Sequence, residues 1–180
     1  MNKKLIYCAV ILPLLVADSS RAEEKIDRRE VRRLAKLPTE DILRDSPVER
    51  IEVADYWKKV NGRDRPMVVF FYSNSHAPSQ RVATLIRYVA PHYKDRIALA
   101  VVKVADKGDP DRKTAEALRK QFSLDSTPGI LFYDNVGTKT VLEDEEYIDP
   151  DFKEFRSPSM LFWSVYYSTV RKELDALLSD

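Results

Sequence analysis

The sequence is poor in the residues that most often carry chemistry. Its 180 residues include one cysteine, Cys8, two histidines and four glycines. Everything after Cys8 lacks a thiol, which excludes disulfide cross-links and thiol redox chemistry there. So few histidine and cysteine ligands give no convincing transition-metal site, and we predict no metal and no cofactor. The formal net charge of +1 gives no global attraction for nucleic acid.

The first 22 residues have the pattern of a secretory signal peptide. Lys3 and Lys4 precede an apolar stretch from Leu5 to Ala17, and Ser20-Arg21-Ala22 offers small residues at the positions that signal peptidase reads. The apolar stretch is short for a membrane-spanning helix. We therefore predict cleavage near Ala22, a periplasmic or secreted protein, and no integral membrane segment after cleavage. The mature chain would lose Cys8 and carry a net charge near zero.

Residues 23–45 form a charged N-terminal extension in this prediction. Basic residues recur in it at spacings of one, three and four, and on a helix they would form one stripe: Arg28, Arg29, Arg32, Arg33 and Lys36. The apolar counterpart is sparse: Ile26, Val31, Leu34 and Leu37. Two interpretations are open, a solvated helix and a docking arm for an acidic partner or the membrane surface.

Residues 46–180 are predicted to form one α/β domain. Apolar runs predict strands over 48–53, 67–72, 97–104 and 129–133, with a return strand over 138–142. Amphipathic segments predict helices over 54–60, from Pro78 to a kink or end at Pro91, over 112–122, and from Ser157 to about Leu178. The helix over 54–60 is expected to bury Tyr56, Trp57 and Val60. Helical crossovers imply parallel strand pairing, and the turn at Gly137 implies antiparallel pairing, so a small mixed sheet with helices on both faces follows.

Small polar residues follow the strand 67–72, and a helix begins directly after them. Open α/β sheets place their sites at such a junction. His76 falls at the predicted helix N-terminus, where the helix dipole disfavours the imidazolium form. Three interpretations of His76 remain open: an exposed residue without a role, a contact for a bound peptide, and a general base acting with Ser75 or Ser79. The serines Ser73, Ser75 and Ser79 could cap the helix or bind an anion.

From about Val48 to Leu178 the chain resembles the thioredoxin-like superfamily. The resemblance depends on the strand, loop and helix from Phe71 to Gln80, on Thr127-Pro128 before the strand 129–133, and on the hairpin and final helix. It implies an α/β thioredoxin-like fold with a cis-proline at Pro128. It also implies a peptide groove beside that proline, lined by Ser75, His76, Ala77, Pro78, Ser79, Thr127 and Pro128.

The departures from the family concern its reactive groups. His76 and Ser79 stand where the family has its nucleophilic and its resolving cysteine, Tyr72 and Ser75 replace two tryptophans, and Phe70 falls where many members bury a carboxylate. Exchange of disulfides needs a thiolate, so the family's activity does not transfer. We predict a redox-inactive protein-binding module of the cell envelope that acts as a chaperone, a scaffold or an accessory subunit. The alternatives are a thiol-independent enzyme using His76 or Ser79 and a purely structural subunit that binds through its C-terminal helix.

The last predicted helix has two apolar faces. One should pack on the sheet: Phe162, Tyr166, Val170, Leu174 and Leu177. The other, formed by Met160, Trp163 and Tyr167, is a candidate partner surface unless the N-terminal arm or the preceding loop covers it. The acidic run over 143–151 could attract a hard cation, but it lacks the glycine turn and the spacing of a calcium loop, which favours a solvated loop.

Overall fold

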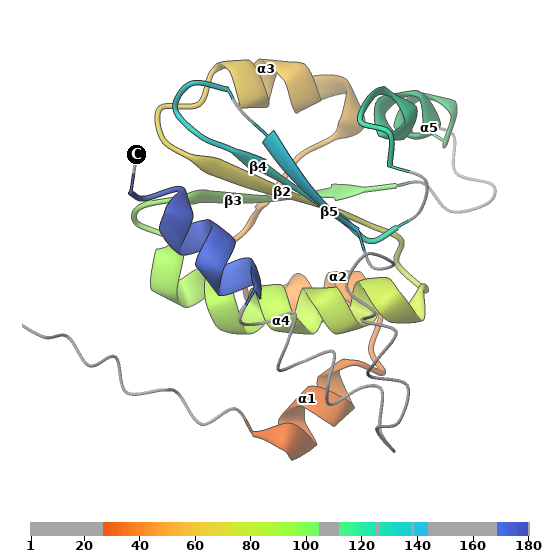
Figure 1. The fold of residues 1–180 in the computed structure, drawn as a ribbon. Helices are drawn as coiled ribbons and strands as arrows, with labels where there is room; N and C mark the ends of the chain where they lie inside the picture. The colour runs from red at the N-terminus through yellow and green to blue at the C-terminus, as the bar shows by residue number, and fades with distance from the viewer. Residues whose placement is uncertain (1–26, 105–111, 125–126, 138, 144–168, 180) are drawn as a thin grey trace, which may run out of the picture.

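The computed structural model describes residues 27–104, 112–124, 127–137, 139–143 and 169–179 (Figure 1). The predicted signal peptide, the partner surface Met160, Trp163 and Tyr167, and most of the acidic run lie outside these residues. Along the chain the elements are α1 (Arg28–Leu34), α2 (Thr39–Leu43), β1 (Glu49–Arg50), η1 (Val53–Asp55), α3 (Tyr56–Asn61), β2 (Met67–Tyr72), α4 (Ala77–Tyr93), β3 (Ala98–Lys103), α5 (Arg112–Gln121), β4 (Gly129–Tyr133) and β5 (Lys139–Glu143). Residues 169–176 form a further helical segment, called here the C-terminal segment.

The five strands form one mixed sheet in the order β1-β3-β2-β4-β5. Strands β1 and β2 both run parallel to β3, whereas β4 runs antiparallel to β2 and β5 antiparallel to β4. Strand β2 is central and all six of its residues are buried, as its unbroken run of apolar residues predicts for a strand covered on both faces. Parallel crossovers followed by an antiparallel hairpin confirm the predicted fold class, an α/β thioredoxin-like fold.

Helices cover both faces of the sheet (Figure 1). Successive residues of β2 point to opposite faces. Val68, Phe70 and Tyr72 therefore pack in the core shared with α2, α4 and the C-terminal segment. Val69 and Phe71 pack in the core shared with α3 and α5. The face of the last helix predicted to meet the sheet is confirmed where it is described: Val170 and Leu174 are fully buried, and Leu177 packs beside them.

The charged N-terminal segment differs from its prediction. Its basic residues Arg29, Arg32, Arg33 and Lys36 are exposed, but Val31 and Leu34 are buried. Helix α2 inserts Ile42 and Leu43 into the core beside α4. A solvated helix is therefore the wrong description, because the apolar residues of the segment are sufficient to pack it on the domain. Figure 1 shows α1 and α2 on the α4 side of the sheet.

Three smaller expectations also need correction. Only Glu49 and Arg50 of the predicted strand 48–53 pair with β3, and Val53 begins a 3₁₀ turn. Trp57, expected to be buried, is 41% exposed, because Tyr56 and Val60 occupy the core side of α3. Helix α4 continues past Pro91 to Tyr93. A proline so near the C-terminus removes one helical hydrogen bond in the final turn and leaves the rest of the helix intact.

Candidate functional site

The candidate site lies between the end of β2 at Tyr72 and the start of α4 at Ala77. Ser75, His76 and Ala77 are exposed there. His76 occupies the position before the first helical residue with extended backbone angles, φ −88° and ψ 119°, and its side chain makes no capping hydrogen bond. Pro78 in the first turn suits the helix start because its fixed φ is helical and its missing N–H is not needed there. The imidazole is therefore presented to solvent and takes no part in capping the helix.

Ser79 has a different environment from the one predicted. It is fully buried, and its Oγ accepts a hydrogen bond of 3.2 Å from the backbone N–H of Ser73. The hydroxyl thus ties the first residue of the loop to the first turn of α4. A side chain in this position cannot touch a peptide lying on the surface. The structure removes Ser79 from the groove lining that the sequence suggested, and it weakens the interpretation of Ser79 as a nucleophile.

Thr127 and Pro128 lie at the same end of the sheet as this loop. The peptide bond between them is cis. Gly129 pairs with Phe71, so Pro128, one residue earlier, lies beside the last residue of β2. Pro128 is buried, whereas Thr127 is partly exposed. The exposed surface at this end therefore combines Ser75, His76 and Ala77 from the loop with Thr127, which precedes β4. Pro128, like Ser79, is buried and is not part of the exposed lining that the resemblance implied.

Gly129 leaves room for the side chain of Leu124 where β4 begins. A Cβ atom placed on it would lie 2.9 Å from Cδ2 of Leu124, which is itself buried. Real Cβ contacts are essentially never so short, so any larger residue would displace Leu124. The buried side chain of Leu124 therefore packs directly against the start of β4, two residues after Thr127.

The contact of the N-terminal segment with this loop was not predicted from the sequence. The backbone N–H of Thr39 donates to the carbonyl oxygen of Asn74 at 3.0 Å, and the Thr39 hydroxyl donates to the carbonyl of Ser73 at 3.2 Å. The N–H of Glu40 donates to Oδ1 of Asn74 at 3.0 Å. A faint signal existed, because Pro38 precedes α2 and cannot cap it with a side chain, so a capping oxygen had to come from elsewhere.

Charged groups flank the loop on the α2 side. Nζ of Lys103 lies 3.6 Å from Oε1 of Glu40, and Arg50 donates to the backbone carbonyl of Glu40 at 3.3 Å.

Among the described residues, no group of three or more potential ligands could hold a metal ion. In that same part of the chain, no helix is both long and apolar enough to cross a bilayer.

Comparisons with known proteins add little beyond the fold. No family model matches the sequence, and no curated protein matches it significantly. Among solved structures, chloroplastic thioredoxin z is similar over 53% of this chain and 80% of its own length, with 20% identity and a TM-score of 0.43. Strand order and pairing define the fold class, which is thioredoxin-like, and the β2–α4 loop contains no cysteine.

Proposed function

We propose that this chain is a redox-inactive, thioredoxin-like protein-binding module of the cell envelope, serving as a chaperone, a scaffold or an accessory subunit. One observation carries the proposal: the β2–α4 loop exposes Ser75, His76 and Ala77 at the same end of the sheet as Thr127 and contains no cysteine. Without a thiolate at this position the loop cannot exchange disulfides. What it retains is a set of exposed residues, with Ser75 and His76 polar, against which an extended chain can lie.

The envelope location is supported by the sequence of the first 22 residues, with their basic start and apolar stretch. The same feature supports the absence of thiol chemistry throughout the mature chain, because Cys8 would leave with the signal peptide.

Two alternatives remain as outcomes of the test. A thiol-independent enzyme would have to rely on His76, because the hydroxyl of Ser79 is buried and accepts the Ser73 N–H. A structural subunit would bind through the surface of Met160, Trp163 and Tyr167 and would not use the loop.

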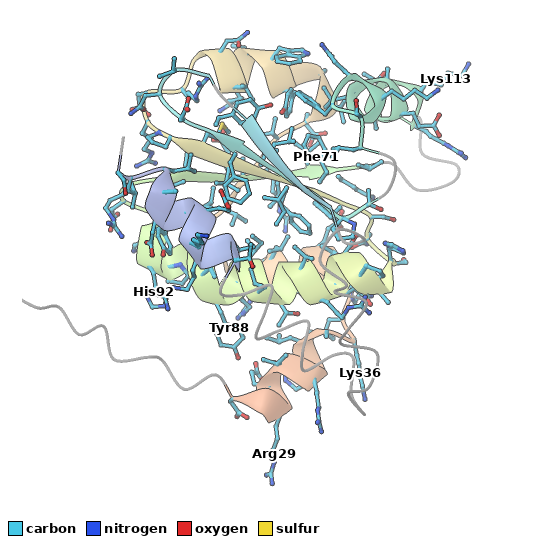
Figure 2. All side chains as sticks on the ribbon, in the orientation of Figure 1. Arg29, Lys36, Phe71, Tyr88, His92 and Lys113 are labelled. Atoms are coloured by element: carbon cyan, nitrogen blue, oxygen red, sulfur yellow. The ribbon has the colours of Figure 1, made fainter. Side chains whose placement is uncertain are left out.

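Binding of an unfolded polypeptide tests the proposal directly. The probe is reduced and carboxymethylated lactalbumin, which has no reactive thiols, and the variants are His76→Ala and His92→Ala. His92 is the matched control, since it is also exposed and lies at the far end of α4 from the loop (Figure 2). Loss of one polar contact worth about 1 kcal/mol should weaken binding by about fivefold in His76→Ala, with His92→Ala unchanged.

Other results identify the alternatives. If the wild-type protein does not bind the probe, or if the two histidine variants weaken binding equally, the loop is not a peptide site. If Trp163→Ala abolishes binding while His76→Ala has no effect, the C-terminal surface is the binding site. Turnover in a hydrolase screen that disappears in His76→Ala would establish the enzyme.

A further inference from the structure

We propose that Asn74 and Thr39 act as a positioning pair that holds the β2–α4 loop against helix α2 and fixes the backbone from which Ser75 and His76 contact a bound chain. This inference rests on the proposed function and assigns to it two residues outside the contact surface. It also gives the N-terminal segment a role in the site.

The pair joins two segments that lie 34 residues apart. Asn74 accepts twice, through its backbone carbonyl from the Thr39 N–H and through Oδ1 from the Glu40 N–H. The Thr39 hydroxyl donates to the carbonyl of Ser73. Asn74 thereby satisfies two of the backbone N–H groups that the start of a helix leaves without partners. The loop supplies acceptors for the N–H groups at the start of α2, and the Thr39 hydroxyl supplies a donor for the Ser73 carbonyl, so the contact is specific.

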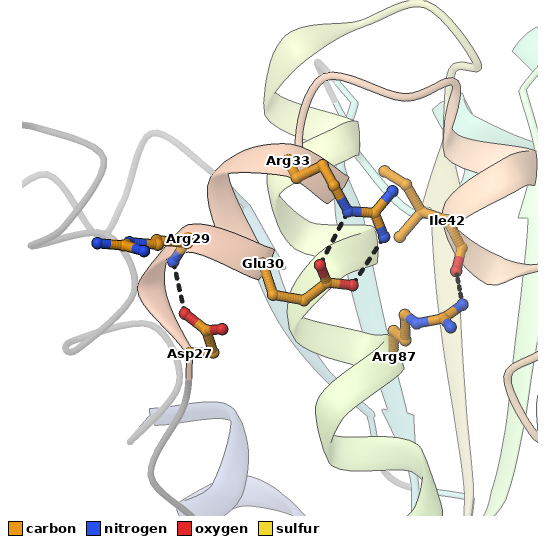
Figure 3. Close-up of polar contacts among 6 residues, drawn as sticks. All are labelled: Asp27, Arg29, Glu30, Arg33, Ile42 and Arg87. Carbon is orange, nitrogen blue, oxygen red and sulfur yellow. Dashed lines mark hydrogen bonds and ion pairs between the residues drawn. The ribbon is translucent and has the colours of Figure 1, made fainter.

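Helix α2 is a fixed anchor for this contact. Thr39 and Ile42 are fully buried and Leu43 is nearly so. Arg87 of α4 donates through Nη1 to the carbonyl oxygen of Ile42 at 2.8 Å, which ties the end of α2 to the helix that follows the loop (Figure 3). The loop is therefore held against an element that is itself packed on α4.

The loop is held from a second side as well. The Ser73 N–H donates to the buried Oγ of Ser79, while the Ser73 carbonyl accepts from Thr39. Ser73 and Asn74 are thus fixed from both α4 and α2, and Ser75, His76 and Ala77 are left exposed. A loop that is already ordered loses less conformational entropy when a ligand binds, so the positioning pair should raise affinity without touching the ligand.

The test uses the full chain and two pairs of variants. Asn74→Ala removes the acceptor for the Glu40 N–H, and Asn74→Asp retains an acceptor oxygen and should rescue. Thr39→Val removes the hydroxyl bond to Ser73. Thr84→Val is its matched control, because Thr84 is equally buried and its hydroxyl also donates to a backbone carbonyl, that of Gln80 at 2.8 Å within α4.

The first readout is amide hydrogen exchange and needs no ligand. We expect the amides of Glu40 and His76 to exchange about fivefold to tenfold faster in Asn74→Ala, as the loss of one part-buried hydrogen bond implies, and at the wild-type rate in Asn74→Asp. Faster exchange at His76 is also expected in Thr39→Val and not in Thr84→Val. If only the Glu40 amide responds and His76 keeps its wild-type rate, the pair does not position the loop and the inference is overturned.

The second readout is the affinity for carboxymethylated lactalbumin, which should fall by about fivefold in Asn74→Ala and recover in Asn74→Asp. Faster exchange at His76 with unchanged affinity would contradict the role in binding. A wild-type protein that does not bind the probe at all would refute the proposed function, and the exchange rates would still decide whether the pair holds the loop.

Discussion

Tyr56 and Tyr133 bring their hydroxyl oxygens to 2.6 Å of each other in the core beneath α3. Burial raises the pKa of both groups, and for Tyr56 the hydrogen bond with Tyr133 raises the pKa further. Burial also raises the pKa of Tyr93, whose hydroxyl donates to Asp175 of the C-terminal segment at 2.8 Å. These tyrosines keep their protons at pH values where an unfolded chain loses them.

This difference in tyrosine pKa between the folded and unfolded states predicts that the protein loses stability at alkaline pH. Below pH 10, the ordinary tyrosine pKa, both states hold the proton and the stabilisation is complete. Above it the unfolded state ionises while the folded state does not, so the free energy of unfolding falls as the pH rises. Denaturant titrations across this range should show the fall, with a shallower slope in Tyr56→Phe. Equal slopes in the two proteins would contradict the account.

The hydrogen bond between Tyr56 and Tyr133 also predicts a loss of stability at neutral pH when one of the two hydroxyls is removed. Tyr56→Phe leaves the buried Tyr133 hydroxyl without its tyrosine partner and should lower the free energy of unfolding by about 1–3 kcal/mol. Replacing both tyrosines by phenylalanine should cost less than the sum of the single changes, because the two groups interact directly. Additive losses, measured by denaturant titration, would show that the hydroxyls do not depend on each other.

At the scale of elements, α2 belongs to the core. Ile42 and Leu43 lie among residues of β2 and α4, although the sequence assigned this segment to a charged extension. Ile42→Ala and Leu43→Ala should each lower the free energy of unfolding of the whole domain by about 2–5 kcal/mol. The exposed control Lys36→Ala should change it by less than about 0.5 kcal/mol. If the unfolding midpoint is insensitive to Ile42→Ala and Leu43→Ala, α2 is only an appendage.

The sequence predicted elements well where the chain is apolar without interruption. Strands β2 and β4 match their predicted bounds, because buried central strands need continuous hydrophobic runs. Trp57 was misplaced because the pattern could not show which neighbour faces the core. Its ring instead packs edge-on against Tyr56, with centroids 5.2 Å apart, and remains partly exposed.

The site was predicted only in part, because some of its contacts join residues that are far apart in the sequence. The sequence pattern placed His76 at the N-terminus of the helix that follows strand 67–72, and this position agrees with the structure. The burial of Ser79 and the contacts of Asn74 with Thr39 and Glu40 depend on segments that meet only after folding. Apart from Pro38, which cannot cap α2 with a side chain, no local pattern indicates such contacts.

At the scale of the whole molecule, redox inactivity can be tested directly. The full protein should not accelerate the reduction of insulin by dithiothreitol, because no thiol follows Cys8 and the β2–α4 loop holds His76 and Ser79 instead. The measurement is the turbidity of precipitating insulin chains, with dithiothreitol alone as the baseline. Acceleration above that baseline would contradict redox inactivity.

The short β1 strand has a consequence for the behaviour of the molecule in concentrated solution. It contributes only Glu49 and Arg50 to the sheet margin, both side chains are exposed, and Glu49 pairs with Lys59. A two-residue margin bearing charges offers an incoming chain few hydrogen bonds and no apolar surface. Two molecules of this protein therefore gain little by pairing their sheets edge to edge through β1. This edge offers no template for the growth of fibrils.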